Sequence, residues 1–483
     1  MLEGLEVSVL NFSKTFIDNS VKRFDAEYFK KEYLIEDNLR AKIKNKYLGD
    51  ISFITDGQHG YHEVDENSPI RHLKAQNFKN WFAVDNNAER IAKWVDDNNK
   101  RSSLEVDDIV LTTRGSVGFC AIVKDDVLPA NIDQDVARIK LNSFNEIIPQ
   151  FLLSYINSRF GQDWTKRNQT GMVQQGLSLW RVREFPIPVL SKGFQEKVKD
   201  IIESSKEQIN TSQNKYSHAE TILLQEIGLQ NYEPSKAPVN IKGFKESFGV
   251  TGRLDAEYYQ KKYEDLIRYI KKNCEFKRLE DLTTFINNGN QPPYSETGEI
   301  IFFSQKWIND KGIDYSFIKR PNEPKVDKSF FDDNKNKSYL IKKYDILYYS
   351  VGANLGFCHN YLADERIAIG SFINLIRPDL NKINPIYIGI VLNSIVGRMQ
   401  SEKEKSGVAQ PYIYAKNLRE FLIPIIAPHK QEQIAELVEE SFKLKVESER
   451  LLEVAKKAVE MAIEVNEEKA MKYIKDNEQA HAS

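Results

Sequence analysis

The stretch Arg183-Glu184-Phe185-Pro186-Ile187-Pro188 returns 236 residues later as Arg419-Glu420-Phe421-Leu422-Ile423-Pro424. A charged stretch with helical periodicity follows each copy. Solenoid repeats have periods of about 20 to 50 residues, so a repeat of this length indicates two tandem domains instead. The sequence therefore predicts two similar modules, each followed by a long helix.

Length and composition describe a protein larger than one hydrophobic core usually supports. The chain has 483 residues, 41% of them hydrophobic, and a mean hydropathy of −0.52. Two domains with connecting helices are expected at this length. A membrane-spanning helix needs about 18 apolar residues in a row, and neither such a run nor a basic leader with an apolar block is visible. These features predict a cytoplasmic protein. The net charge of −2 neither predicts nor excludes a nucleic-acid partner.

Cysteine and histidine usage argues against a metal or disulfide framework. Cys120, Cys274 and Cys358 are too few and too dispersed for either. Cys120 and Cys358 follow Gly-Phe at matching repeat positions, which predicts small buried residues behind a turn. The best metal candidate is His59-x-x-His62 with His72 nearby, but it has no counterpart in the second half. We therefore assign no metal site.

The two halves share a frame but not its contents. Arg23-Phe24-Asp25-Ala26-Glu27 matches Arg253-Leu254-Asp255-Ala256-Glu257, and we expect each acidic pair to begin a short helix. Leu48-Gly49-Asp50-Ile51 matches Leu279-Glu280-Asp281-Leu282, and a glycine follows each. The next segments, residues 58–80 and 291–311, differ between the halves. Similar frames thus carry different inserts.

Strand-like runs at residues 108–112 and 345–349 each lead into a glycine turn. A glycine pair after a strand could indicate a phosphate-binding loop. Here the Gly-Lys-Ser/Thr ending and the Gly-x-Gly-x-x-Gly pattern are both missing, and no clear amphipathic helix follows. We predict tight hairpins.

Asn384-Pro385-Ile386-Tyr387 superficially resembles the Asn-Pro-Pro-Tyr/Phe box of adenine methyltransferases. The equivalent first-half residues are Ile148-Pro149-Gln150-Phe151, so the repeat shares a proline near a helix start but not the amide. This comparison favours a helix start over catalysis.

A polar loop follows in each half, at residues 167–175 and 404–412. These loops combine amides, hydroxyls and a cation. Gln, Asn, Lys and Arg read base edges, and Ser, Thr and Lys hold phosphates, so the loops are candidate DNA contacts. An ordinary solvated loop is the alternative.

Apolar and small residues after each module recur with alternating steps of three and four. Such seams, from Val198 to Leu223 and from Ile434 to Val465, predict long helices that pack along a narrow stripe. The many Ser and Ala residues favour close antiparallel pairing of the two helices within one chain, which would relate the modules by a pseudo-twofold axis. Packing of each helix on its own module alone is the alternative.

Taken together, these residues resemble the specificity subunit of type I restriction-modification systems, which are phage-defence systems. The resemblance covers nearly the whole chain. It is carried by the module starts, the glycine turns and the closing block from Gly407 through Leu418, Pro424 and Pro428 to Ile434, whose first-half copy runs from Gly171 to Val198. Each motif is weak alone, but they occur twice in the same order with a helix after each.

The resemblance implies a fold and a role. The expected fold is α+β, with two tandem, similar α/β target recognition domains separated by two long antiparallel coiled-coil helices about a pseudo-twofold axis. We place target recognition domain 1 at 1–192, the central spacer helix at 193–230, domain 2 at 231–427, the C-terminal spacer helix at 428–475 and a disordered tail at 476–483.

Such a subunit has no catalytic activity and reads one half of an asymmetric bipartite DNA site with each domain. The resemblance implies double-stranded DNA, two methyltransferase subunits and two restriction/translocase subunits as partners, with no membrane. S-adenosylmethionine, ATP and Mg²⁺ are expected on the partner subunits only, and this chain is expected to hold no cofactor. Much of the phosphate contact is expected to come from the partners, since this chain is nearly neutral.

Candidate DNA-binding residues are the amide, basic, histidine and tyrosine side chains of the inserts, turns and polar loops. In the first module they are Gln58, His59, Tyr61, Arg71, Lys74, Gln76, Arg114, Arg167, Gln169 and Gln174. In the second they are Gln291, Tyr294, Gln305, Lys306, Asn354, Lys405, Gln410 and Tyr412.

Two other classes of protein remain as alternatives. A self-sufficient DNA methyltransferase or nuclease would need a cofactor loop and a complete catalytic box, and neither is visible. A coiled-coil scaffold for protein partners would lack clustered Gln, Asn, Lys and aromatic residues in its modules. Both are weaker than the DNA specificity subunit.

Overall fold

The computed structural model describes residues 9–13, 15, 23–171, 175–309, 312–319, 322–333, 335–407 and 409–479. The chain divides into two compact units: unit 1 comprises residues 1–209 and 446–483, and unit 2 comprises residues 210–445. The two unit boundaries fall inside α7 (Lys192–Glu226) and α13 (Pro428–Glu464). Across the described ranges, no helix is long and apolar enough to cross a membrane.

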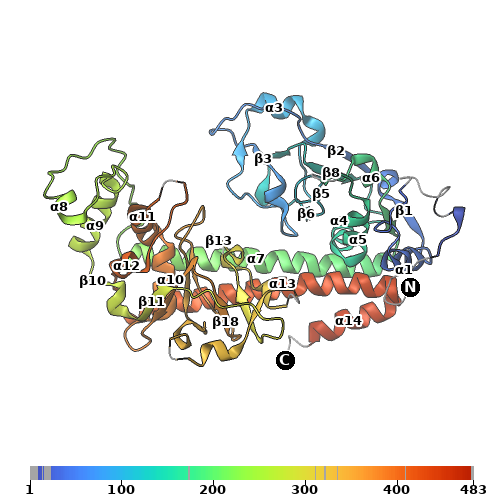
Figure 1. Ribbon diagram of the computed structural model, residues 1–483. Helices are drawn as coiled ribbons and strands as arrows, with labels where there is room; N and C mark the ends of the chain where they lie inside the picture. The colour runs from blue at the N-terminus through green and yellow to red at the C-terminus, as the bar shows by residue number, and fades with distance from the viewer. Residues whose placement is uncertain are drawn as a thin grey trace. The chain divides into compact units, whose positions relative to one another are not determined.

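Each unit is built on a four-stranded antiparallel sheet with the same strand order. In unit 1 the order is β2 (Ser52–Asp56), β8 (Val136–Leu141), β5 (Ile109–Thr112) and β6 (Cys120–Ile122). In unit 2 it is β11 (Thr283–Asn288), β19 (Ile373–Pro378), β16 (Ile346–Tyr349) and β17 (Cys358–Asn360). Figure 1 shows β2, β5, β6 and β8 together beside α4. The predicted hairpins are confirmed, because β5 pairs with β6 and β16 with β17 across the glycine turns.

Successive side chains of the central strands point to opposite faces of each sheet, and both faces are buried. In β5, Ile109 and Leu111 pack in the core with α4 (Pro149–Asn157) and α5 (Arg159–Asn168), whereas Val110 packs in a separate core with the first insert. In β16, Ile346 and Tyr348 face α10 (Pro385–Asn393) and α11 (Ile395–Glu404), whereas Leu347 faces the second insert. The shared frame therefore lies on one side of each sheet and the divergent insert on the other.

The inserts share a small strand core although their sequences differ. In unit 1, β3 (Arg71–Leu73) lies between β4 (Glu89–Arg90) and β7 (Ala130–Ile132). In unit 2, β12 (Ile300–Phe303) lies between β15 (Lys325–Val326) and β18 (Ile367–Ile369). In unit 1, β3 pairs antiparallel with β4 and parallel with β7. In unit 2, β12 likewise pairs antiparallel with β15 and parallel with β18. The first insert adds α3 (Lys93–Asn98), and the second adds β13 (Ile308–Asn309) and β14 (Gly312–Ile313).

The repeated Arg-Glu-Phe motif joins the start of each frame to its end. The buried Phe185 and Phe421 carbonyls accept hydrogen bonds from the Leu48 and Leu279 backbone N–H groups, both at 2.9 Å. The residues that follow each Phe form short edge pairings. These join β1 (Asn45–Tyr47) to β9 (Pro186–Pro188) and β10 (Phe276–Arg278) to β20 (Leu422–Pro424). The remaining short helices are α1 (Lys31–Arg40), α2 (Leu48–Ile51), α6 (Leu179–Arg183), α8 (Phe248–Thr251), α9 (Lys261–Asn273) and α12 (Ala415–Arg419).

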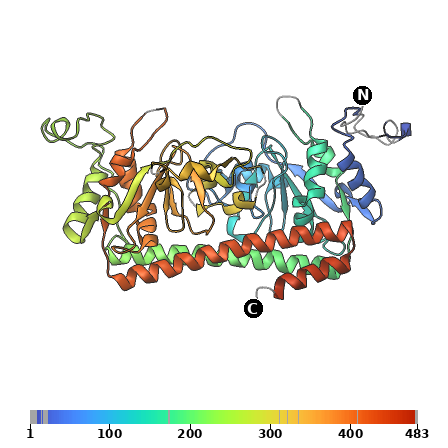
Figure 2. The ribbon, with the colours of Figure 1, turned by 60° about the horizontal axis from the view of Figure 1, so that its bottom comes forward.

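The two long helices run side by side (Figure 2). Reciprocal serine pairs join them. In unit 1 the hydroxyls of Ser205 and Ser448 lie 2.7 Å apart, and each also donates to the other residue's carbonyl. In unit 2 Ser212 and Ser441 make the same arrangement at 3.0 Å. Lys215 contacts Glu440, and Glu226 contacts Lys430, so the pairing in unit 2 is antiparallel. Small buried residues allow this close approach, as the seam predicts.

Three local expectations need correction. The single helix predicted over 428–475 is two helices, because α13 ends at Glu464 and α14 (Glu467–Gln479) folds back on the start of α7, burying Ala470 and Ile474. The predicted tail begins at residue 476, yet α14 runs to Gln479. The acidic pairs near Asp25 and Asp255 lie in turns ahead of α1 and α9, where each Asp pairs with the preceding Arg.

The proline segment at residue 385 is a helix start, as the repeat comparison indicates. The side chain of Asn384 accepts hydrogen bonds from the Ile386 and Tyr387 N–H groups and caps α10. The amide therefore satisfies backbone donors that a helix start leaves free. Its role is structural.

Candidate nucleic-acid interface

The ends of the predicted polar loop of unit 1, Thr170 and Gly176, pair with each other beside the end of β5. We call residues 170–176 the hairpin loop of unit 1, of which residues 172–174 lie outside the described residues. Thr170 and Gly176 exchange backbone hydrogen bonds of 2.8 and 2.9 Å, and Leu177 N–H donates to the Thr113 carbonyl at 2.8 Å. Arg114 and Gly176 form a β-bridge. The loop is therefore held beside the glycine turn that leaves β5, although the two segments are about 60 residues apart in the sequence.

In unit 2, Ser406 and Tyr412 repeat these contacts at equivalent positions. We call residues 406–412 the hairpin loop of unit 2, of which residue 408 lies outside the described residues. Ser406 and Tyr412 exchange backbone hydrogen bonds of 2.8 and 2.9 Å, and Ile413 N–H donates to the Ser350 carbonyl at 2.9 Å. Val351 forms the bridge with Tyr412. The frame thus builds the same turn and loop pair twice, and it places Arg114 in one unit where Val351 stands in the other.

A pocket of about 370 Å³ opens between the hairpin loop and the turn of unit 1. Its lining is mostly polar and includes Asp56, Thr113, Arg114, Gln134, Thr170, Gln175 and Ser178. Arg114 is half-exposed, and its guanidinium lies 3.7 Å from the Asp135 carboxylate, a loose ion pair. Sequence reasoning missed Gln134 and Gln175, although Gln175 adjoins the predicted Gln174. Gln174 itself lies outside the described residues.

Several predicted residues of the first insert are accessible. Tyr61 is 89% exposed, and His59 and Gln76 are exposed. Gln58 is half-buried, and its side-chain amide donates to the Tyr61 carbonyl at 2.9 Å. The backbone N–H of Gln58 donates to the Ile132 carbonyl, so the segment starts from a fixed point on the sheet.

Other predicted side chains are engaged in structural contacts. Arg71 contacts Asp85 at 2.6 Å and donates to the Leu128 carbonyl. Arg167 is 9% exposed, because its guanidinium contacts Asp37 and the Tyr28 carbonyl, both at 2.7 Å. Burial and pairing favour a structural role for these two arginines, which tie distant segments together. Lys74 contacts Glu89 at 2.8 Å, and the Gln169 carbonyl accepts from Arg23.

In unit 2 the predicted insert residues lie on two segments. Gln291 and Tyr294 are exposed, and their side chains are 3.4 Å apart. Lys306 is exposed and contacts Glu323 at 3.2 Å, whereas Gln305 is half-buried.

The remaining predicted residues of unit 2 surround the hairpin loop. Asn354 is half-buried in the turn after β16, and Gln410 is exposed in the loop. Tyr412 is half-buried and its ring contacts that of Tyr414 at 4.7 Å between centroids. Lys405 pairs with Glu402, and its carbonyl accepts from Arg253. Turn and loop residues are thus brought together in unit 2 as in unit 1.

A family model described as "Type I restriction modification DNA specificity domain" matches residues 64–221 and 271–455. The chain belongs to this family. We call the two matched ranges the first and second specificity domain. Each contains the central strand, the glycine turn and the hairpin loop of its unit.

Relatives of the specificity domains include proteins from several bacteria. The type I restriction enzyme EcoBI specificity subunit from Escherichia coli is 30% identical over 106 residues, which are 22% of this chain and 22% of that subunit. The aligned part spans about a fifth of that relative's length. The S subunit of a type I restriction-modification system from M. genitalium aligns over 87% of this chain and 95% of its own, with 12% identity and a TM-score of 0.39. The HsdS subunit from Thermoanaerobacter tengcongensis aligns over 88% and 97%, with 14% identity and a TM-score of 0.27.

The cysteines of the specificity domains are suited to packing. Cys120 and Cys358 are buried behind the glycine turns, and Cys274 is half-buried. Burial raises the pKa of all three thiols, and that of Cys358 reaches about 12. The prediction of small buried residues at the two matching positions is confirmed.

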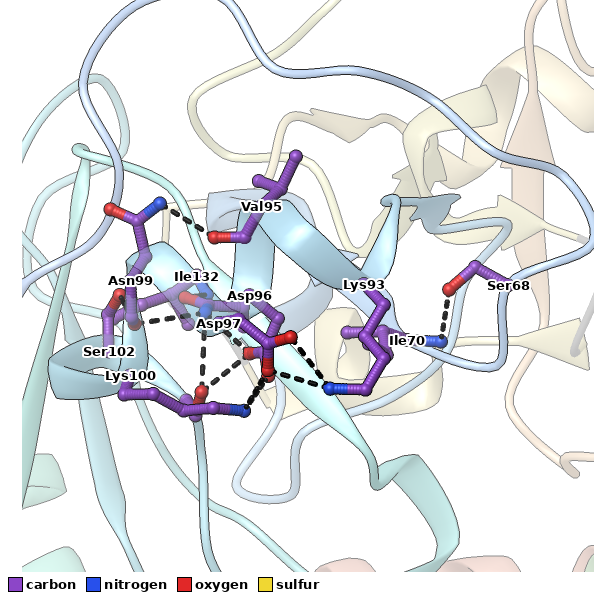
Figure 3. Close-up of polar contacts among 12 residues, drawn as sticks. Ser68, Ile70, Lys93, Val95, Asp96, Asp97, Asn99, Lys100, Ser102 and Ile132 are labelled. Atoms are coloured by element: carbon purple, nitrogen blue, oxygen red, sulfur yellow. Dashed lines mark hydrogen bonds and ion pairs between the residues drawn. The ribbon is translucent and has the colours of Figure 1, made fainter.

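A buried carboxylate anchors the insert of the first specificity domain to its strand core. Asp96, on α3, accepts hydrogen bonds from Asn131 at 2.8 Å and from Ser103 and Lys100 at 2.5 Å. Figure 3 shows Asp96 and Asp97 side by side, with the Lys93 and Lys100 ammonium groups directed toward them. Burial acts to raise the pKa of Asp96, but these hydrogen bonds outweigh it and lower the pKa below its usual 3.8.

We expect Asp96→Ala to lower the free energy of unfolding by about 1–3 kcal/mol at pH 7, because the buried Asn131 amide loses its 2.8 Å hydrogen bond and keeps only longer ones, such as that to the Asn99 carbonyl at 3.2 Å. The lowered pKa means that the carboxylate stabilises the fold above pH 3.8. This stabilisation is lost as the pH falls through the lower, folded-state value. Urea denaturation at pH 7 and pH 3 measures the difference, which should shrink at pH 3. Asp97→Ala is the control, since Asp97 is exposed and should change little. A larger loss for the control would contradict this assignment.

The histidines of the first insert are arranged differently from the sequence expectation. His59 is exposed and its Nε2 lies 2.9 Å from Asp56 Oδ2. His62 and His72 instead lie with Glu89, and the ligand atoms of these three are within 4.8 Å of one another. Sequence reasoning missed Glu89, because the pairing of β3 with β4, rather than spacing along the chain, places it opposite His72. Burial, then the nearby His62 and Lys74, lower the pKa of His72 to about 4.

Proposed function

We propose that this chain is the DNA-binding specificity subunit of a type I restriction-modification complex, each unit reading one half of a bipartite, asymmetric site. One observation carries the proposal. Each unit has its own sheet with the same strand order and the same pair of glycine turn and hairpin loop, while the inserts and the residues at equivalent positions differ. A repeated frame presents two surfaces, and different side chains on them recognise different bases.

The proposed contact residues are accessible side chains of the turn, the hairpin loop and the insert. In unit 1 they are Gln58, His59, Tyr61, Gln76, Arg114, Gln134 and Gln175. Gln174, which lies outside the described residues, is proposed from the sequence alone. In unit 2 they are Gln291, Tyr294, Lys306, Asn354, Gln410 and Tyr412. Glutamine and asparagine match adenine in the major groove, and arginine matches guanine or a phosphate. The loose pairing of Arg114 with Asp135 leaves its guanidinium available for such a contact.

The proposal includes a non-catalytic role. Catalysis would reside on two methyltransferase subunits and two restriction subunits, which would hold S-adenosylmethionine, ATP and Mg²⁺. The near-neutral charge of this chain supports a shared DNA interface, since phosphate binding depends on Lys and Arg in excess. The isolated chain should then bind DNA weakly and lose that binding steeply as salt rises.

We expect Arg114→Ala to relax recognition of one half-site only. Loss of a base contact costs about 1–3 kcal/mol of discrimination, and a contact in one unit cannot serve the other half-site. Competition binding with oligonucleotides substituted singly at each position, using the assembled complex, measures this. Val351→Ala is the matched control at the equivalent position of unit 2, where no cation is lost. Equal damage by Arg114→Ala at both half-sites would refute the modular assignment.

The function itself is tested by mapping methylated adenines across the genome of a host with and without this chain. A bipartite methylated motif that depends on the chain is the expected result. Methylation that is unchanged on its removal, in a host that expresses the partner subunits, would overturn the proposal. Methylation by the chain alone would instead support a self-sufficient methyltransferase.

A further inference from the structure

Two facing strands and one loop bring imidazole and carboxylate groups together in unit 1. His72 on β3 and Glu89 on β4 are directly opposed in an antiparallel pair, so their side chains project from the same face. His62, from the loop before β3, brings its ring edge-on to His72, with centroids 4.2 Å apart. Its Nε2 lies 3.2 Å from Glu89 Oε2. One ligand atom from each of the three residues lies within 4.8 Å of the others.

The buried member of this cluster has unused ligand atoms. His72 is 3% exposed, and in the described structure neither ring nitrogen has a hydrogen-bond partner of normal geometry. Most buried polar groups in proteins do have partners, and one without them indicates a strain site, a functional site or an ion. The lack of hydrogen-bond partners for His72 is an observation separate from the clustering of the three side chains. It points toward a ligand that accepts nitrogen lone pairs.

We propose that His62, His72 and Glu89 bind a divalent transition-metal ion of the zinc class. Two imidazoles and one carboxylate suit Zn²⁺, whereas Ca²⁺ and Mg²⁺ take oxygen ligands. Three protein ligands leave a fourth position for water. The present separations of up to 4.8 Å close by small side-chain rotations, for which His62 and Glu89 have room because both are partly exposed.

The Lys74 side chain must move away from Glu89 for a metal ion to bind. Its ammonium contacts Glu89 Oε2 at 2.8 Å and would lie beside the bound cation. The Lys74 side chain is 37% exposed, so it can swing into water. Metal binding would then join the loop before β3 to the strand pair. It would also release the Lys74 ammonium into solvent, close to the start of the first insert.

The test uses the tag-free full chain, stripped with EDTA, and needs no DNA. Zinc affinity and stoichiometry come from competition with a chromophoric chelator, and Co²⁺ gives a visible spectrum sensitive to coordination number. We expect one ion per chain. His62→Ala and Glu89→Gln should each weaken zinc binding by more than about 100-fold, beyond the usual effect of losing an outer-shell partner.

His59→Ala is the matched control, because His59 lies three residues from His62 but pairs with Asp56 outside the cluster. It should bind zinc like the unaltered chain. His72→Ala removes a buried ring and could fail to fold, so the two partly exposed ligands carry the test, with melting curves to confirm folding. Absence of stoichiometric binding, binding retained by the His62→Ala, Glu89→Gln double variant, or equal loss in His59→Ala would each overturn the site. Because DNA plays no part, failure here leaves the proposed function untouched.

Discussion

Arg138→Leu is expected to lower the free energy of unfolding by about 3–5 kcal/mol, because it leaves a buried carboxylate without its cation. Arg138, on β8, and Asp108, directly before β5, are 4% and 3% exposed, and their side chains meet at 2.6 Å. The Arg138 guanidinium also donates to the Arg101 carbonyl at 3.0 Å and contacts Glu105. Burial already raises the pKa of Asp108 even with Arg138 beside it.

Denaturant unfolding of matched variants measures this effect. Lys140→Leu, two residues along the same strand, is the control, because Lys140 and its partner Glu105 are exposed and such pairs contribute little. The Asp108→Asn, Arg138→Leu double variant should recover part of the loss, since no buried charge remains. Unit 2 repeats the pair as Arg377 and Asp345 at 2.6 Å, so Arg377→Leu should behave alike. A loss for Arg138→Leu no larger than that for Lys140→Leu would show the pair to be dispensable.

Gly57→Ala is expected to abolish recognition by unit 1 and leave unit 2 intact. A Cβ at Gly57 would lie 1.8 Å from the Ile132 carbonyl oxygen and 2.5 Å from that of Asp133. Both are backbone atoms, at the last residue of the insert strand β7 and at the residue after it, and Gly57 N–H donates to the Asp133 carbonyl. The segment must therefore shift, which costs about 1–3 kcal/mol or more and moves the whole start of the first insert.

Gly289→Ala is the reciprocal experiment. Gly289 lies just before the second insert, and its Cβ would lie 2.2 Å from the carbonyl oxygen of Gly370, the residue after β18, so unit 2 should lose its half-site. Gly193→Ala in α7 is the control, with no atom within 4 Å of the added Cβ and a favourable helix propensity. Half-site discrimination by the assembled complex is the measurement. Loss of both half-sites from either single substitution would argue that the two units do not read DNA separately.

Features that depend on neighbouring residues were predictable from sequence. The strands at residues 109 and 346, the helices that begin at Pro149 and Pro385 and the paired long helices follow from local periodicity and proline placement. The repeat itself separated frame from insert. It also argued against a catalytic role for Asn384, since only a helix start with proline is common to both copies.

Side-chain fate depended on contacts that no local pattern encodes. Arg167 resembles a DNA-binding arginine in sequence. Its guanidinium is nevertheless bound by the Asp37 carboxylate and the Tyr28 carbonyl, both more than 100 residues away in the chain. Glu89 joined the histidines only through strand pairing. Gln134 lines the pocket between the turn and the hairpin loop of unit 1 because the chain fold brings these segments together.

By itself the sequence determined that the chain contains two copies of one frame, joined to two long helices, because repeats and periodicity are properties of residue order. Only the tertiary structure decided which polar side chains remain available for a ligand. Availability depends on whether a partner from elsewhere in the chain already satisfies the group, as Asp37 does for Arg167. Neither ring nitrogen of His72 has a hydrogen-bond partner of normal geometry among the described residues.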